Sequence, residues 1–497
     1  MNPDLPPKTQ SMQKVTIKQG PKISDYQAYA SLRDRVDFFL KESEGHLRAL
    51  QGKRVWMINS TATGGGVAEM LPSQIRLLRE LGLEVEWLVL ESKNPRFFSL
   101  TKKLHNAIHG SGSEAFGQAE RSVYENENRL NLASALQVIR DGDLVVIHDP
   151  QPMPLAAMLK AERELSFIWR CHIGLEEQNE ASKAAWDFLA PYFSDYDAFV
   201  FSLEAYVPKE LVGSAHIITP AIDPLSHKNR TLQMHKCIGI LHQSGILNDR
   251  PPILYDFYQH RVRRVQPDGS YGPVDQPARL DLIYRPSITQ ISRWDRLKGF
   301  QELLSAFVYL KQNAASLIPG AVPRDIARIN ICRLVLAGPD PAFIADDPEG
   351  QEVLAELTAA YQQAPETVQK DIALLLLPLH NAKENALIVN ALQRSSSIIV
   401  QNSLQEGFGL TATEAMWKKV PVLVSGAAGL RRQVQPGVNG RINTSATDIP
   451  TLARSLAEML TQPKERDKWS FNGQIRVIDH FTLFSQLQAW LKLWAEV

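Results

Sequence analysis

The stretch RVWMINSTATGGGVAEMLPSQIRLLRELGLEVEWLVL, residues 54–90, predicts the fold class of this chain. It opens with a short apolar run (54–60), turns at a glycine-rich segment (61–66), continues with helical periodicity and closes in a second apolar run (85–90). A strand, a turn, a helix and another strand in this order are typical of a parallel sheet covered on both faces by helices. Pro72 fits the helix only near its first turns or at a kink.

The same alternation extends along most of the chain, on both sides of a middle segment. Further apolar runs typical of buried strands lie at 143–149, 166–172, 198–202 and 216–220, and then at 286–292, 330–338, 372–379, 396–403 and 420–426. Residues 260–281 interrupt the alternation, since they are rich in proline, glycine and charge, and they indicate an exposed insertion in a hinge region. We therefore predict two α/β halves, with boundaries near residues 225 and 284.

The two ends of the chain carry patterns of their own. Residues 1–23 are polar and predict a loose arm, whereas residues 24–50 have apolar side chains at helical spacing. The final residues, 480–497, place large apolar side chains on one helical face. This last helix should pack on a core, and it can reach back to the first half.

Composition bounds the class of protein and its partners. The chain has 497 residues, too many for one ordinary core, and Lys plus Arg equals Asp plus Glu at 54 each. The formal net charge of +0 argues against nucleic acid or an anionic membrane as a partner held by overall charge. Three scattered cysteines form neither a disulfide framework nor a zinc motif. Because no signal peptide and no run of about 18 apolar residues is evident, we expect a cytoplasmic protein.

Two loops that follow predicted strands offer groups for binding phosphate. Gly64, Gly65 and Gly66 lie between a strand and a helix, where backbone N–H groups and the helix dipole favour an oxyanion. A plain tight turn is an equally good interpretation of the glycines. Arg293 and Lys298 follow another strand, and such cations suit a diphosphate. Solvated charges at a helix start remain the alternative.

The segment SLQEGFGLTATEAMW (403–417) places a carboxylate on each side of a glycine turn. Gly407 and Gly409 permit a tight strand-to-helix connection that exposes N–H groups. Glu406 can accept hydrogen bonds from sugar hydroxyls, and Glu414, about one turn into the helix, can reach a ribose diol. A helix with a favourable N-terminal acid and a solvent-facing glutamate is the alternative. A glycosidase pair is not selected by this spacing.

Two histidines end apolar strands in the first half, in HDPQP (148–152) and WRCHIG (169–174). A lone histidine is more often structural than catalytic, but two at strand ends in one half favour a shared cleft. Neither has Cys or Asp partners at metal-ligand spacing, so we predict no metal site.

These segments together resemble the retaining family 4 glycosyltransferases of GT-B fold, and more narrowly the glycosyltransferring trehalose synthases. The matching stretches run in the family's order over about residues 52–495 and include NSTATGGGVAEML, VVIHDPQP, WRCHIGL, AIDPLSHKN, ITQISRWDRLKG, NALQRSSSIIVQNSLQEGFGLTATEAMWKK and PVLVSGAAGL. The resemblance implies an α/β protein with two Rossmann-like parallel-sheet domains and an interdomain cleft. Its parts would be an N-terminal arm and helix (1–50), an acceptor domain (51–225), a hinge with insertion (226–284), a nucleotide-sugar domain (285–475) and a C-terminal helix (476–497).

The resemblance also implies a role for each matched residue. Arg293 and Lys298 would hold the donor diphosphate, Glu406 the transferred sugar and Glu414 the ribose. His172 would position the reacting sugars. The donor would also meet Gly65, Gly66, Gly407, Phe408, Gly409, Leu410 and Thr411, and the acceptor would meet Gly64, His148, Asp149 and Arg170.

The implied reaction moves a glucosyl unit from ADP- or UDP-glucose to a small sugar, with retained configuration and without a metal or other cofactor. Glucose as acceptor would give trehalose. Retaining trehalose phosphorylase, transfer to another small sugar or polyol, and a catalytically silent sugar-nucleotide sensor remain alternatives. A homodimer is left open. Where the family usually has an aspartate after RCHI, this chain has Gly174, so its acceptor contacts differ and the acceptor need not be glucose.

Overall fold

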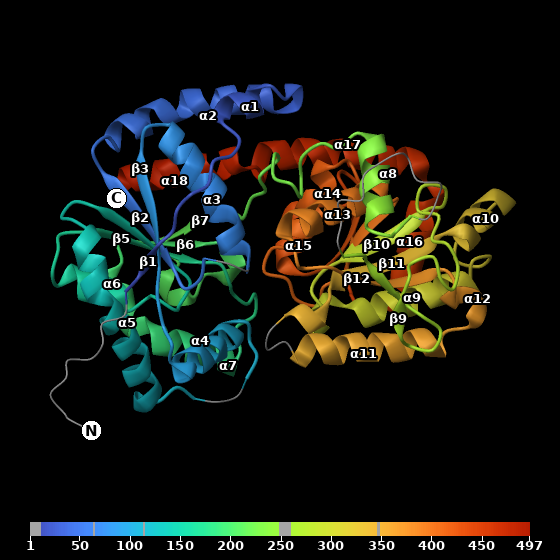
Figure 1. Cartoon of the computed structure of the whole chain (residues 1–497), viewed down its shortest axis with the longest axis horizontal. Coiled ribbons are helices and arrows are strands. Elements are labelled where there is room, and N and C mark those ends of the chain that lie inside the picture. Colours follow the sequence, from blue (N-terminus) through green and yellow to red (C-terminus); the bar gives the residue numbers. More distant parts are fainter. Residues whose placement is uncertain (1–10, 63–64, 113–114, 248–259, 345–347) are drawn as a thin grey trace. The chain divides into compact units, whose positions relative to one another are not determined.

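The computed structural model describes residues 11–62, 65–112, 115–247, 260–344 and 348–497, and the chain divides into two compact units (Figure 1). Unit 1 comprises Met1–Ala221 together with Phe481–Val497, and unit 2 comprises Ile222–His480. Unit 2 is therefore continuous in sequence, whereas unit 1 takes its last helix from the end of the chain.

Unit 1 is built on a seven-stranded sheet in the order β1-β3-β2-β4-β5-β6-β7. All neighbouring strands are parallel except the edge strand β1, which pairs antiparallel with β3. The inner strands are almost entirely buried, which explains their unbroken apolar sequence. The strands are β1 (Gln13–Lys14), β2 (Arg54–Asn59), β3 (Glu84–Val89), β4 (Leu144–His148), β5 (Ser166–Cys171), β6 (Ala198–Phe201) and β7 (Ala215–Ile217).

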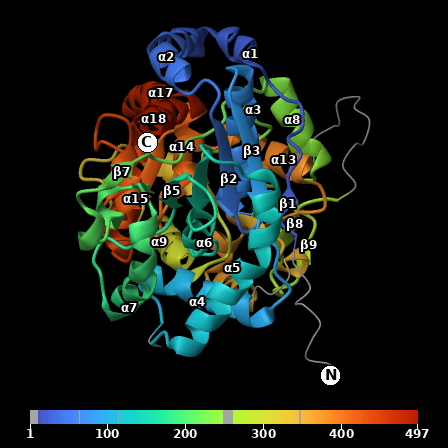
Figure 2. The ribbon, with the colours of Figure 1, turned by 90° about the vertical axis from the view of Figure 1, so that its left-hand side faces the viewer.

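Helices surround this sheet, as Figure 2 shows from the side of unit 1. The α-helices of the unit are α1 (Ile23–Gln27), α2 (Ala30–Ala49), α3 (Gly65–Glu80), α4 (Pro95–Ile108), α5 (Gln118–Val138), α6 (Leu155–Lys160), α7 (Glu180–Leu189) and α18 (Leu483–Glu496). Three short 3₁₀ helices accompany them, η1 (Ala190–Asp195), η2 (Glu204–Tyr206) and η3 (Lys209–Leu211).

The C-terminal helix α18 packs against the N-terminal helices. The Phe484 ring lies 5.1 Å from that of Tyr26 and 5.5 Å from that of Phe39, measured between centroids. All three side chains are fully buried. Beside them, Arg35 donates to the Gln488 side chain over 2.9 Å. The apolar face expected at the end of the chain thus completes the core of unit 1.

Unit 2 contains an eight-stranded sheet in the order β15-β14-β13-β10-β11-β12-β8-β9. The strands from β15 to β12 are parallel, and β8 and β9 extend the sheet antiparallel. The strands are β8 (Arg263–Val265), β9 (Tyr271–Gly272), β10 (Ser287–Ile291), β11 (Arg333–Pro339), β12 (Ile372–Leu377), β13 (Ile398–Gln401), β14 (Val422–Ser425) and β15 (Arg441–Asn443).

Helices of unit 2 cover both faces of this sheet and enclose an apolar core on each. The helices are α8 (Met234–Gln243), α9 (Phe300–Gln312), α10 (Pro323–Ile331), α11 (Pro348–Gln363), α12 (Glu366–Gln369), α13 (Ala382–Ser395), α14 (Leu410–Trp417), α15 (Ala428–Gln433), α16 (Ile449–Thr461) and α17 (Pro463–His480), with 3₁₀ helices η4 (Arg296–Lys298) and η5 (Pro341–Phe343). Among the described residues, no helix is both long and apolar enough to cross a membrane.

The α/β class with two largely parallel sheets is confirmed, and each of the eleven apolar runs contains a strand. The segment 260–281 differs from the prediction of an exposed insertion, because β8 and β9 lie in the sheet of unit 2. Arg264 of β8 is fully buried and donates to the carbonyls of Ala278 over 2.6 Å and Ile372 over 2.5 Å. Residues 248–259, also assigned to the hinge region, and much of the N-terminal arm lie outside the described residues.

Candidate active site

The candidate site in unit 2 centres on an ion pair between Lys298 and Glu406. Lys298 Nζ lies 2.8 Å from Glu406 Oε2, and the two side chains are 16% and 11% exposed. The same carboxylate oxygen accepts from the Ser403 hydroxyl over 2.9 Å and from Gln401 Nε2 over 3.3 Å. A cation and two neutral donors thus converge on one oxygen of the Glu406 carboxylate.

The backbone of Lys298 is held in place by the side chain of Gln290. Gln290 of β10 donates to the Lys298 carbonyl over 2.7 Å and accepts from the Asn402 N–H over 2.9 Å. The next residue, Gly299, has φ of 62°, and a Cβ there would lie 2.0 Å from the Asn402 carbonyl oxygen. Only glycine therefore allows the loop of Lys298 to lie against the segment that leads to Glu406.

The turn after Glu406 is fixed by close packing and by one buried glutamine. Gly409 has φ of 84° and precedes α14. A Cβ on Gly429 would lie 2.5 Å from Phe408 Cα, so this turn packs directly on the backbone of α15. Gln433 donates to the carbonyls of Phe408 and Gly409. Gln433 thus occupies the carbonyls of Phe408 and Gly409. Because the first N–H groups of an α-helix have no acceptor within the helix, those at the start of α14 can bind an oxyanion.

Glu414 lies in α14 and belongs to a second polar group. It is 7% exposed, accepts from Gln393 Nε2 over 3.4 Å and lies 3.9 Å from Lys228 Nζ. Lys418, one turn further along, is buried and donates to Gln393 Oε1 over 2.6 Å and Asn229 Oδ1 over 2.9 Å. Burial lowers the pKa of Lys418 to about 7, although Glu414 opposes the shift. Glu414 is therefore held in place and is not the solvent-facing glutamate of the alternative interpretation.

Arg293 and Thr411 complete the matched residues of unit 2. The Arg293 side chain is 75% exposed, and its one ion pair within the described ranges is with Asp295, at 3.8 Å. Thr411, in the first turn of α14, donates to the Ile291 carbonyl over 3.4 Å, which joins that helix to the end of β10. The structure thus brings Lys298 and Glu406 into contact, whereas the Arg293 side chain, five residues before Lys298, extends into solvent.

In unit 1, the two predicted histidines are in contact. His148 Nδ1 and His172 Nε2 share a hydrogen bond of 3.1 Å, and the rings are stacked with an interplanar angle of 11°. Burial, and then the charge of Arg170, lowers the pKa of His148 to about 3 and holds that of His172 well below its usual value. Both imidazoles are therefore neutral at physiological pH, which suits them to hydrogen bonding rather than to carrying charge.

Asp149 and Arg170 stand beside this histidine pair. Asp149 has φ of 62° and accepts from the His172 N–H over 2.9 Å. Burial raises the pKa of Asp149 to about 6 and lowers that of Arg170 to about 10. Arg170 donates to Ser202 over 3.3 Å, and its Nη1 is buried without an acceptor among the described residues.

The glycines singled out in unit 1 differ in how much space surrounds them. Gly66 lies near the start of α3, and a Cβ there would meet nothing within 4 Å, so the loop is open at this point. Gly65 is the first residue of α3, and Gly64 lies outside the described residues. Gly174, where the resemblance led us to expect an aspartate, packs so tightly that a Cβ would lie 2.3 Å from Tyr206 Cβ.

A pocket of about 370 Å³ opens in unit 1 beyond the carboxyl ends of β2, β3 and β4. Its polar groups are Ser60, Thr61, Ser92, Thr101, Lys102, His105 and Gln151, and Phe97 and Phe98 supply aromatic surface. Ligands of open α/β sheets bind at this edge of the sheet. Hydroxyl and amide groups beside aromatic rings suit a sugar, whose hydroxyls and apolar ring faces need both.

Four residues that help to hold the two glutamates in place were not predicted from the sequence. Gln401, Ser403, Gln393 and Lys418 hold the two glutamates, yet none belongs to a spacing typical of catalysis. In the sequence, these four residues are distinguished only by lying near the residues matched to the family. Among the described residues, no group of three or more His, Cys, Asp or Glu side chains is arranged to hold a metal ion.

The chain resembles known proteins in both units. Residues 57–208 match the family model described as the trehalose synthase N-terminal domain, and residues 284–476 match glycosyl transferases group 1. Solved structures with a similar fold include a UDP-forming trehalose-phosphate synthase from Burkholderia xenovorans, with a TM-score of 0.64 and 15% identity, covering 90% of this chain and all of that one. The chain is thus a glycosyltransferase of GT-B fold.

Full-length relatives narrow the assignment. The trehalose synthase of Pyrococcus horikoshii is 31% identical over 479 residues, 95% of either chain. That of Rubrobacter xylanophilus is 30% identical over 478 residues, which are 96% of this chain and 97% of the relative. This chain belongs to the trehalose synthase family. It is a hexosyltransferase, which transfers a glycosyl group to a sugar.

Proposed function

We propose that the chain is a retaining family 4 enzyme that transfers a glucosyl unit from a nucleotide-glucose, ADP- or UDP-glucose, to a small sugar. The observation that carries this proposal is the Lys298–Glu406 pair at 2.8 Å, placed beside a glycine turn that precedes α14. A cation, a carboxylate and the N–H groups at the start of a helix, all within one unit, provide what a diphosphate and a hexose require.

In this proposal, Lys298 and Arg293 stabilise the negative charge that develops on the leaving nucleoside diphosphate. Electrostatic stabilisation of this kind is a large contribution to catalysis. Glu406 accepts hydrogen bonds from hydroxyls of the transferred sugar, and the backbone of 407–411 lines the sugar and phosphate. Glu414 binds the ribose diol. We also assign Gly65 and Gly66 to the donor, and we assign no metal ion or other cofactor.

The proposed reaction retains the configuration at the anomeric carbon. The acceptor hydroxyl attacks from the face that the diphosphate leaves, its oxygen bonds to the anomeric carbon as the bond to phosphate oxygen breaks, and the leaving phosphate takes its proton. Glu406 is already bound to Lys298, Ser403 and Gln401. These contacts hold the carboxylate in one orientation, which supports a binding role.

For the acceptor, we propose the polar groups of unit 1. The pocket lined by Ser60, Ser92, His105 and Gln151 has the size and chemistry for a monosaccharide. We also assign His148, His172, Asp149 and Arg170 to the acceptor. The two imidazoles are neutral, and Asp149 accepts from the His172 N–H over 2.9 Å. The relatives are trehalose synthases, which supports trehalose as the product and glucose as the acceptor.

The test is a mass-spectrometric screen of purified protein with ADP-, UDP-, GDP-, CDP- and TDP-glucose against glucose, glucose 6-phosphate and small polyols. We expect a disaccharide from glucose with ADP- or UDP-glucose, and an α-linkage by NMR. A product with inverted configuration, or donor binding without transfer to any acceptor, would overturn the proposal. Equal turnover with and without a chelator is expected, because Lys298 and Arg293 supply the positive charge.

A second candidate is a retaining trehalose phosphorylase. The trehalose phosphorylase of Pleurotus pulmonarius is 24% identical over 456 residues, although these span only 56% of that longer protein. A phosphorylase uses inorganic phosphate and has no ribose to bind. The assignment of Glu414 to a ribose diol therefore favours the nucleotide donor. Incubation with trehalose and inorganic phosphate separates the two, because only a phosphorylase releases glucose 1-phosphate without nucleotide. A homodimer and a cytoplasmic location stay predictions.

A further inference from the structure

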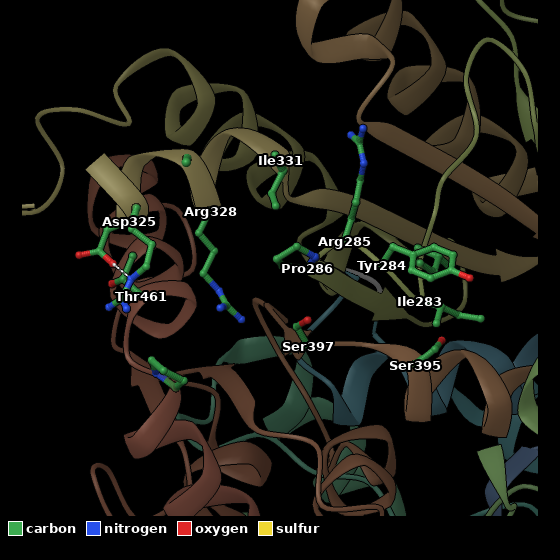
Figure 3. Close-up of a pocket in the computed structure, with 14 residues that line it drawn as sticks. Ile283, Tyr284, Arg285, Pro286, Asp325, Arg328, Ile331, Ser395, Ser397 and Thr461 are labelled. Atoms are coloured by element: carbon green, nitrogen blue, oxygen red, sulfur yellow. Dashed lines mark ion pairs between the residues drawn. The ribbon is translucent and has the colours of Figure 1, made fainter. Parts of the chain in front are cut away.

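Unit 2 contains a second hollow, which the proposed reaction does not use. It has a volume of about 630 Å³ and is walled by residues 282–286, by α10 and by the start of α17 (Figure 3). Pro286 and Ser397, which line it, directly precede β10 and β13. Lys298 and Glu406 follow the carboxyl ends of these same strands. The hollow therefore lies at the opposite edge of the sheet from the candidate active site.

The charge of the hollow is predominantly positive. Arg285, Arg324 and Arg328 line it together with one acidic residue, Asp325. Arg324 lies 3.9 Å from Asp325, and Arg285 lies 3.5 Å from Asp281. Arg328 has no hydrogen-bond acceptor in the part of the chain that the structure describes, and its Nε is buried. Figure 3 shows the Arg328 side chain extending from α10 toward the middle of the hollow, on the side facing Ser397.

A second arginine lies close to Arg328 and increases the positive charge. Arg466 of α17 is only 8% exposed, and its Nε is likewise buried without an acceptor among the described residues. Burial lowers the pKa of Arg466, and the charge of Arg328 lowers it further. Two guanidinium groups that repel each other are stabilised when an anion binds.

The chemistry of the walls indicates which anion fits. An arginine fork binds phosphate through two parallel hydrogen bonds, and hydroxyls of the kind offered by Ser395 and Ser397 are further phosphate or sugar ligands. Pro286, Ile331 and Tyr284, whose side chain is 74% exposed, add apolar and aromatic surface. The volume of the hollow is that of a small-molecule site.

We propose that this hollow binds a small phosphorylated organic molecule, with its phosphate on Arg328 and its remainder against Pro286 and Ile331. A sugar phosphate and a nucleoside monophosphate share this chemistry. The proposal does not rest on the proposed function, because it uses neither the Lys298–Glu406 pair nor any group of unit 1.

The test measures binding by calorimetry with three probes, glucose 6-phosphate, adenosine monophosphate and inorganic phosphate. The full-length chain carries Lys298→Ala in every sample, so that phosphate binding at the candidate active site is weakened throughout. We expect one of the two organic phosphates to bind, and to bind more tightly than inorganic phosphate. The preferred probe tells a sugar phosphate site from a nucleotide site. Binding of inorganic phosphate alone, or of no probe at millimolar concentration, would overturn the proposal.

Variants then locate the binding. Adding Arg328→Ala should weaken the preferred probe by about tenfold or more, because a charge-assisted pair of hydrogen bonds is lost. Arg328→Lys should bind with intermediate affinity, and Arg454→Ala, an exposed arginine on α16, should bind like the parent. Removing Arg328 relieves repulsion with Arg466, so the variant should fold; Arg328→Gln serves as a second neutral replacement. Unchanged affinity in both neutral variants would show that the hollow is not the site.

Discussion

The polar groups of the two units differ in how they handle charge. In unit 1, His148 and His172 are buried, stacked and neutral, and the buried Asp149 has a raised pKa. In unit 2, Lys298 and Glu406 form an ion pair that remains partly open to solvent. Unit 1 therefore offers buried, neutral hydrogen-bonding groups suited to hydroxyls, whereas unit 2 keeps a partly exposed ion pair suited to a diphosphate.

The largest effect should come from removing the charge in unit 2. Lys298→Ala is expected to lower kcat by roughly 10²-fold or more, since loss of one group that stabilises transition-state charge has that magnitude. Steady-state kinetics with saturating substrates would measure it. Arg296→Ala is the matched control, because Arg296 lies in the same 3₁₀ helix but pairs with Glu352 and Glu356 at the surface. Near-normal turnover of a folded Lys298→Ala variant would remove Lys298 from the mechanism.

The stability of unit 1 should fall when a side chain is added at a tightly packed glycine. Gly174→Ala would place a methyl group 2.3 Å from Tyr206 Cβ, and overpacking of this kind costs about 1–3 kcal/mol. Thermal unfolding should therefore begin at a lower temperature than in the parent. Gly213→Ala, where a Cβ would meet nothing within 4 Å, is the control and should unfold like the parent. Equal stability of both variants would mean that Tyr206 moves freely, and that an aspartate could be tolerated at position 174.

A smaller effect on substrate affinity is expected from Glu414. Glu414→Ala should raise the donor KM by about tenfold with little change in kcat, because a hydrogen bond to a charged group contributes about 1.5–3 kcal/mol. Donor titrations at saturating acceptor would measure it. Glu356→Ala, which removes an exposed carboxylate of α11, should leave KM unchanged. A fall in kcat without a change in KM would assign Glu414 to the chemical step instead.

The smallest effect is on the pH dependence of stability. The pKa of His172 is lower in the folded chain than in the unfolded chain, so the unfolded state binds more protons below about pH 6.5. Its contribution is present above that pH and is lost as the pH falls. Asp149, with its raised pKa of about 6, opposes this loss between about pH 6 and 4.

Comparison of variants isolates the contribution of the histidine. Between pH 6.5 and 5.5, His172→Gln should lose about 1 kcal/mol less stability than the parent, because Asp149 contributes equally in both. Urea unfolding at each pH provides the measurement. His216→Gln changes an exposed histidine of β7 and should follow the parent. Parallel stability curves for His172→Gln and the parent would contradict the neutral, buried state of His172.

The strands could be predicted because burial on both faces leaves long apolar runs, such as those of β4 and β12. The short strands β1, β8, β9 and β15 have two or three residues and no detectable period. In the site, contact between His148 and His172 follows from the pairing of β4 with β5. The side chains that hold Glu414 in place could not be predicted. Gln393 lies on another helix, α13, and Lys418 is a buried lysine that donates to Gln393. No sequence spacing distinguishes either residue.

The order in which the chain leaves the ribosome has a consequence for its folding. Unit 2 is one uninterrupted stretch, Ile222–His480, and all its core residues are available before synthesis ends. Unit 1 begins first but lacks α18, whose Phe484 fills the space between Tyr26 and Phe39. The half of the protein that is begun first is therefore completed only after all of unit 2 has been made, and a nascent chain arrested before Phe481 lacks the helix that covers Tyr26 and Phe39.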